Sequence, residues 1–68
     1  MSIVANGLER PLPPGGTVAD LVAELGHDVS RPGVAVAVNG TVVPRPTWRH
    51  RTLRDGDRVE VLTAAQGG

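Results

Sequence analysis

The residues best suited to chemistry close the printed sequence, Gln66-Gly67-Gly68. Two glycines make the thinnest peptide that a chain allows, and they adopt backbone angles that other residues rarely reach. Such a tail can enter a narrow channel and present the α-carboxylate of Gly68 inside the active site of another protein. Chain ends are also commonly disordered without any function, so the rest of the sequence has to decide between these interpretations.

Side chains elsewhere offer little for catalysis. The sequence has no cysteine, which excludes a thiol nucleophile, a disulfide framework and a thiolate metal site. His27 and His50 are its only histidines, and two histidines without any cysteine do not favour a metal centre. Gly15-Gly16 lacks the flanking strand and the lysine of a phosphate-binding loop. We therefore expect no catalytic residue, no metal ion and no bound cofactor.

Charge and hydropathy narrow the range of partners. Seven arginines balance seven acidic residues, and the formal net charge is zero. General binding to nucleic acid depends on neutralising many phosphates, so this balance argues against it. The N-terminal residues do not form a secretion signal, and the longest apolar run, residues 34–38, is too short to span a bilayer. We expect a soluble cytoplasmic protein without nucleic-acid or membrane partners.

Two Asn-Gly dipeptides predict two β-hairpins. Asn6-Gly7 and Asn39-Gly40 suit the two-residue type I′ turn, which needs positive φ at both central positions. The first turn joins residues 3–5 to residues 8–12, where Pro11 predicts a strand at the sheet edge because it lacks a ladder donor. The second turn joins residues 34–38 to residues 41–43.

One helix is predicted between the hairpins. Thr17 is placed as its N-cap, and Asp20 completes a capping box. Gly26 suits the residue after its end. A single apolar stripe follows the helical repeat, made of Val18, Leu21, Val22 and Leu25.

After the second hairpin, Pro44 and Pro46 are expected to end the strand. The pattern then predicts one helical turn at residues 47–50 and a last strand at residues 58–61. Alternation along that strand buries Val59 and Val61 and exposes Arg58 and Glu60. Trp48, the only aromatic residue, is expected in the core or as a lid over it.

These elements predict an α+β fold, because a helix with one apolar stripe must cover one face of a sheet. A right-handed connection through the helix allows the first and last strands to lie parallel at the centre. The arrangement is a β-grasp, or ubiquitin-like, fold with a mixed sheet of about five strands covered on one face by one helix. We assign residues 1–63 to this domain and residues 64–68 to a flexible tail ending in Gly-Gly.

Over nearly its full length the chain resembles the ThiS family of bacterial thiamine-biosynthesis sulfur carrier proteins. The most specific matches are Val43-Pro44-Arg45 followed by Trp48, together with the terminal Gly67-Gly68. Further matching stretches are residues 4–7, 17–22, 36–40, 53–60 and 65–66. The chain departs from the usual pattern in having no Phe or Tyr, so its core depends on small aliphatic side chains.

The resemblance implies a carrier that other enzymes act on, and not an enzyme. A ThiF-like adenylyltransferase would use ATP to convert the Gly68 carboxylate to an acyl adenylate, and a sulfur-donor system would replace AMP to leave a thiocarboxylate. A ThiG-like thiazole synthase would then take the sulfur. Gly67 and Gln66 would thread the tail into these partners.

Two alternatives stay open beside this interpretation. One is a carrier like the small subunit of molybdopterin synthase, which uses the same terminal chemistry. The other is a ubiquitin-like interaction module or protein modifier, whose tail forms an isopeptide bond or undergoes no chemistry.

Two regions are candidates for docking a partner protein. Alternation along the strands places Ala35, Ala37 and Leu62 on the face of the sheet that the helix leaves open, and exposed apolar side chains suit a protein partner. Arg45 and Arg49 belong to the densest basic stretch of the chain. A solvated surface is the default interpretation of such a stretch, and contact with an acidic patch is the functional one.

Overall fold

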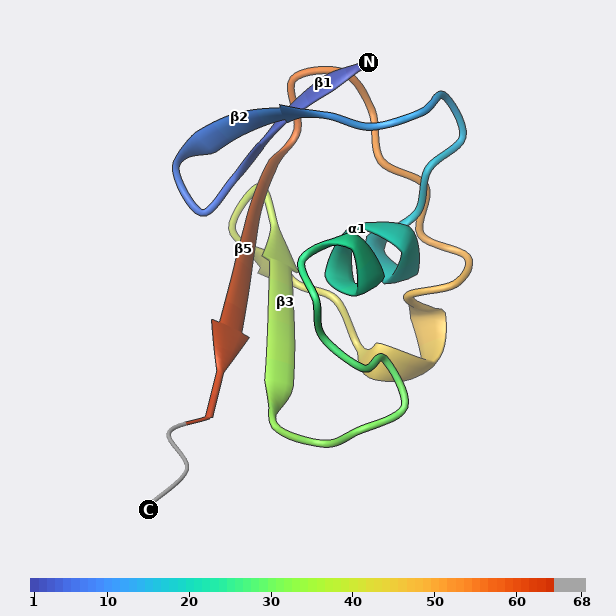
Figure 1. Cartoon of the computed structure of the whole chain (residues 1–68), viewed down its shortest axis with the longest axis vertical. Helices are drawn as coiled ribbons and strands as arrows, with labels where there is room; N and C mark the ends of the chain where they lie inside the picture. The colour runs from blue at the N-terminus through green and yellow to red at the C-terminus, as the bar shows by residue number, and fades with distance from the viewer. Residues whose placement is uncertain (65–68) are drawn as a thin grey trace.

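The computed structural model describes residues 1–64, which contain a five-stranded sheet with one α-helix packed on one face (Figure 1). The elements in chain order are β1 (Ser2–Ala5), β2 (Leu8–Pro11), α1 (Val18–Glu24), β3 (Val34–Val38), β4 (Thr41–Val42), a 3₁₀ helix (Arg45–Thr47) and β5 (Arg58–Thr63). The strand order across the sheet is β2-β1-β5-β3-β4. The predicted α+β, β-grasp fold is confirmed.

Both hairpins form at the Asn-Gly dipeptides. The φ angles are 51° and 83° at Asn6 and Gly7, and 50° and 85° at Asn39 and Gly40. Positive φ at both central positions is the type I′ geometry, whose twist matches that of the flanking strands. β2 lies at one edge of the sheet, as Pro11 predicted, and β4 lies at the other.

β5 lies at the centre of the sheet, parallel to β1 and antiparallel to β3. Figure 1 shows it running the length of the sheet, so that its C-terminal end lies beside the start of β3. Val59 and Val61 are buried, and Arg58 and Glu60 are exposed, which confirms the predicted alternation.

Helix α1 begins at the predicted capping box. The Asp20 N–H donates to Thr17 Oγ1 at 3.2 Å, and the Thr17 N–H donates to Asp20 Oδ2 at 2.9 Å. Two further N–H groups of the first turn donate to the loop that follows the 3₁₀ helix, from Val18 to the Arg51 carbonyl (2.9 Å) and from Ala19 to the Trp48 carbonyl (3.1 Å). These bonds fix the start of the helix against that loop.

The core lies between α1 and the sheet and is built almost entirely from aliphatic side chains. Its buried members are Ile3, Ala5, Leu12, Val18, Leu21, Val22, Val36, Val38, Val43, Trp48, Leu53, Val59 and Val61. Trp48 is 2% exposed, and its Nε1–H donates to the Val43 carbonyl at 2.8 Å. The expectation of a core residue is confirmed.

The helical turn predicted at residues 47–50 is present, because the Thr47 carbonyl accepts the N–H groups of His50 and Arg51, both at 2.9 Å. It continues a 3₁₀ helix that the sequence did not predict. The 3₁₀ helix spans Arg45–Thr47, with Trp48 at its C-terminal cap. Pro44 is extended (φ −60°, ψ 138°) and precedes the turn, while Pro46 lies in the first turn, where a missing N–H removes no helical hydrogen bond. The two prolines therefore start the helix, whereas the sequence interpretation used them only to end a strand.

Candidate functional site

The predicted reactive tail lies largely outside the described residues, which stop at Ala64. Gln66, Gly67 and Gly68 therefore have no structural account, and the predicted boundary between residues 63 and 64 stays a prediction. The described part of the site is the C-terminal end of β5. There the Ala64 N–H donates to the Gly33 carbonyl at 2.7 Å, so pairing on the β3 side continues one residue past the strand.

An apolar surface lies on the face of the sheet opposite α1, close to this end of β5. Ala35 pairs with Leu62 across the β3–β5 ladder, and Ala37 pairs with Val42 across the β3–β4 ladder. Leu62 and Val42 are 63% and 71% exposed. We call these four residues, Ala35, Ala37, Val42 and Leu62, the open-face patch. The predicted docking residues Ala35, Ala37 and Leu62 thus lie together.

Val42 was missed by the sequence interpretation, although a signal for it was present. A two-residue turn at Asn39-Gly40 fixes the register of the hairpin, so that Val38 pairs with Thr41 and Ala37 with Val42. Residues paired in this way project from the same face of a sheet. Turn geometry alone could therefore have added Val42 to the set that contains Ala37.

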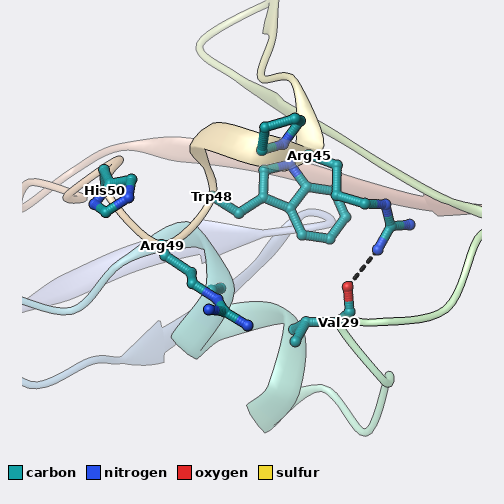
Figure 2. A pocket seen from close by; sticks show the side chains of 7 residues that line it. Val29, Arg45, Trp48, Arg49 and His50 are labelled. Carbon is teal, nitrogen blue, oxygen red and sulfur yellow. Dashed lines mark hydrogen bonds between the residues drawn. The ribbon is translucent and has the colours of Figure 1, made fainter.

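The predicted docking residue Arg45 is engaged within its own chain. Its guanidinium donates to the carbonyls of Val29 and, at 3.3 Å, Val34, and it lies 4.5 Å from the centre of the Trp48 ring (Figure 2). The side chain thus ties the loop between α1 and β3 to the 3₁₀ helix. Its planar fork of donors suits two carbonyl acceptors, and cation–π contact with the indole adds to the attraction.

Arg49 is exposed and lies with Arg45 on the wall of a hollow of about 340 Å³ on the helix side of the molecule (Figure 2). The other lining residues are Ala19, Val29, Pro46, Trp48 and His50. The structure therefore brings the two arginines together. It does not join them to the open-face patch, because that patch lies on the face of the sheet opposite α1, whereas Ala19 of α1 lines the hollow.

Two asparagine side chains hold β5 from opposite sides. Asn6 Oδ1 accepts from the Val61 N–H at 2.8 Å, and Asn6 Nδ2 donates to the Val61 carbonyl at 3.2 Å. Asn39 Oδ1 accepts from the Arg58 N–H at 2.9 Å, and Asn39 Nδ2 donates to Asp57 Oδ1 at 3.0 Å. The sequence interpretation gave both asparagines to turns alone and missed these contacts.

Asp57 strengthens the attachment at the start of β5. Besides the bond from Asn39, its carboxylate accepts the Arg54 N–H at 2.8 Å. Burial acts to raise the pKa of Asp57, but these two hydrogen bonds and the nearby charges of Arg51 and Arg54 outweigh it and hold the pKa below its ordinary value. The ionised carboxylate therefore stabilises the turn from which β5 begins.

Within residues 1–64, no three or more His, Asp and Glu side chains are grouped so that they could hold a metal ion. In the same part of the chain, no helix is both long and apolar enough to cross a membrane.

Comparison with known proteins finds similar sequences and a similar fold. A model of the ThiS family matches residues 3–68. The sulfur carrier protein ThiS of Escherichia coli is 32% identical over 68 residues, which cover all of both chains. A thiazole synthase of Paramagnetospirillum magneticum is 37% identical over 68 residues. This chain spans only 20% of the length of that relative.

A solved structure supports the same relation. The crystal structure of a thiamine biosynthesis protein (ThiS) from Geobacter metallireducens matches this fold with a TM-score of 0.76 and 31% sequence identity, covering all of both chains. The agreement extends over the whole arrangement of β1 to β5 and α1, which independently supports the β-grasp assignment.

Proposed function

The chain belongs to the ThiS family, and on that premise we propose that it carries sulfur for thiamine biosynthesis in the cytoplasm. Gly68 is the residue that is loaded, and the protein is a carrier and cosubstrate that partner enzymes act on. The observation that carries the proposal is the family match, which runs through the terminal Gly67-Gly68. The proposal requires that Gly68 bear a free α-carboxylate.

The loading chemistry follows from the properties of a carboxylate. An α-carboxylate has a pKa of about 3.3 to 3.7, so at neutral pH it is ionised and resists nucleophiles. A ThiF-like adenylyltransferase joins the Gly68 carboxylate to the AMP part of ATP, and pyrophosphate leaves. Sulfide delivered by a sulfur-donor system then attacks the acyl carbon and AMP leaves. The product is a thiocarboxylate, a soft nucleophile that the original carboxylate is not.

The proposed acceptor of the sulfur is a ThiG-like thiazole synthase. Support comes from the relative named thiazole synthase, in which a segment similar to this chain forms part of one polypeptide. In a carrier of this kind, the two glycines matter because they let the tail enter a narrow channel in each partner. Gln66 and Gly67 are proposed to thread through that channel, and ATP is bound by the activating partner.

The open-face patch is proposed as the surface that docks these partners. Its Ala35–Leu62 pair lies beside the end of β5 from which the tail continues. Its side chains are apolar, and all except the half-buried Ala37 are exposed. A partner that covers the patch gains apolar burial while it receives the tail. Arg49 is exposed and free to meet an acidic group, whereas the docking role predicted for Arg45 competes with its bonds to Val29 and Val34.

Mass spectrometry tests the proposal. The protein is incubated with a ThiF-like adenylyltransferase, ATP and a sulfur donor, and the expected product shows replacement of one oxygen by sulfur. A matched variant with one extra residue after Gly68 should keep the circular dichroism spectrum of the wild type and remain unloaded. Loading of that variant would refute Gly68 as the site. Lysine-linked adducts in place of a thiocarboxylate would support a protein modifier instead.

A second step separates the thiamine pathway from the molybdopterin alternative. The loaded protein is offered to a thiazole synthase or to the large subunit of molybdopterin synthase. We expect sulfur transfer with the thiazole synthase. Transfer with the molybdopterin enzyme alone would reassign the pathway while leaving the loading chemistry intact.

A further inference from the structure

The pairing between β1 and β5 follows the regular step of a parallel ladder until the chain turns. The Val4 N–H donates to the Asp57 carbonyl, and the Asn6 N–H donates to the Val59 carbonyl, both at 2.9 Å. Parallel pairing advances by two residues on each strand, so the next step would use the carbonyl of residue 6 and the N–H of residue 8 to bond Val61. Neither can serve, because the chain reverses at Asn6-Gly7 and residue 8 belongs to β2.

The Asn6 carboxamide supplies both missing groups. Its Oδ1 takes the place of a strand carbonyl and accepts the Val61 N–H at 2.8 Å. Its Nδ2 takes the place of a strand N–H and donates to the Val61 carbonyl at 3.2 Å. A primary amide has the same donor and acceptor groups as a peptide unit. The side chain therefore acts as one more unit of β1 and extends the attachment of β5 from Val59 to Val61.

Val61 is the last residue of β5 with a bond on the β1 side among residues 1–64. Further along, the Ala64 N–H bonds to Gly33 on the β3 side. We propose that Asn6 is a positioning residue. It sets the point on β5 beyond which the chain is bonded only on the β3 side, and through that point it sets the position at which Gly68 enters the activating enzyme. This inference rests on the proposed function for its consequence, although its structural part does not.

The physical cost of losing Asn6 is the ordering of more chain. Without its two bonds, β5 is held on the β1 side only as far as Val59, so the pairing of residues 60 and 61 depends on β3 alone and the enzyme must restore the order that Asn6 supplied. Fixing the backbone of a residue costs about 1–2 kcal/mol, and β3 still supplies part of that ordering. We therefore expect the KM for adenylation to rise by roughly threefold to tenfold while kcat changes little.

Asn39 provides a matched control within the same chain. It has the same turn, nearly the same φ (50° against 51°) and two side-chain hydrogen bonds. Those bonds hold Arg58 and Asp57 at the start of β5, far from the tail. Asn6→Gly and Asn39→Gly both keep a residue that accepts positive φ, and each removes two side-chain bonds. The variants differ in which end of β5 is released.

Two readouts compare the variants. The first is hydrogen exchange at the Ala64 amide of the free protein, which needs no partner. The second is the KM and kcat of the adenylyltransferase for each variant. For Asn6→Gly we expect faster exchange at Ala64 and a raised KM. For Asn39→Gly we expect the exchange rate and the KM each to change by less than twofold. We expect the two variants to have equal thermal stability.

Equal effects of the two variants on both readouts, or no effect of Asn6→Gly on the Ala64 amide, would overturn the positioning role. Exchange that responds as expected while KM is unchanged would also overturn it. A wild-type protein that is never adenylated would count against the proposed function alone. In that case, the exchange comparison still decides whether Asn6 sets the root of the tail.

Discussion

The two faces of the sheet differ in how their side chains are used. On the helix side, Val36, Val38 and Val61 are buried against α1, and the Trp48 indole has a hydrogen-bond partner. On the other side, Leu62 and Val42 are 63% and 71% exposed. The same strands supply both sets, because alternate residues project from opposite faces.

This difference separates stability from recognition. Burial of apolar surface is the main favourable term in folding, so residues on the helix side should control the free energy of unfolding. Exposed side chains gain no such burial in the free protein and are available to a partner. Substitutions on the helix side should therefore change stability first, and substitutions in the open-face patch should change loading alone.

The largest expected effect is that of Trp48→Ala. Replacing a buried Trp by Ala typically costs about 3–5 kcal/mol, and one small core rarely supplies more than about that amount. Circular dichroism and urea titration at near-neutral pH should both show a largely unfolded chain. Trp48→Phe, which keeps much of the buried ring but cannot donate to Val43, should stay folded and lose about 1–2 kcal/mol. A fully folded, stable Trp48→Ala would contradict this assignment of the core.

The comparison of Arg45→Ala with Arg49→Ala sharpens the division within the arginine-rich stretch. Arg45 bonds two carbonyls and stacks on Trp48, so its loss should cost about 1–3 kcal/mol in urea unfolding. Arg49 is exposed, so its loss should stay within about 0.5 kcal/mol. Equal effects of the two variants would show that the Arg45 bonds contribute nothing to stability.

Asp57→Asn tests the attachment at the start of β5 through its pH dependence. The folded pKa of Asp57 lies below its ordinary value, so the ionised group stabilises the fold above the unfolded pKa of about 3.9. That contribution is lost as pH falls through the folded pKa. At pH 7 the variant should be less stable by about 1 kcal/mol.

Urea unfolding at a series of pH values checks this sign. The gap between wild type and Asp57→Asn should be constant near neutrality and shrink below about pH 4. Glu60→Gln removes an exposed carboxylate from the adjoining strand β5 and serves as the control, with no such gap expected. A gap that widens on acidification would contradict the hydrogen-bond assignment.

The smallest expected effect on stability is that of Leu62→Ser in the open-face patch. Its free energy of unfolding should change by less than about 0.5 kcal/mol, whereas the KM for adenylation should rise about fivefold to tenfold if Leu62 meets the partner. Leu8→Ser is the matched control. Leu8 is 73% exposed and pairs with the buried Ala5, which places it on the helix side of an edge strand. An equal rise in KM for both variants would remove the open-face patch as the docking surface.

Local patterns in the sequence were sufficient for most of the fold. The Asn-Gly turns, the capping box at Thr17 and the alternation of residues 58–61 each depend on neighbours in the chain, and each is present in the structure. The central position of β5 followed from a general rule of chain connection. The open-face residues Ala35, Ala37 and Leu62 followed from strand alternation in the same way.

The contacts that were missed join residues far apart in the sequence. Asn6 and Val61 are separated by 55 positions, and Arg45 and Val29 by 16. Their bonds depend on strand register and on how a loop packs, which no local pattern contains. The Asn6-Gly7 turn already explained Asn6, and no sequence pattern indicated a second role for this residue. The two prolines at 44 and 46 were ambiguous, because proline both ends strands and begins helices.

The most direct test is to locate the sulfur atom. After incubation with the adenylyltransferase, ATP and a sulfur donor, the protein is fragmented in a tandem mass spectrometer. We predict that the oxygen-to-sulfur replacement is carried only by fragments that contain Gly68. A wild-type protein that stays unmodified, or one whose added sulfur maps to any other residue, would contradict the account.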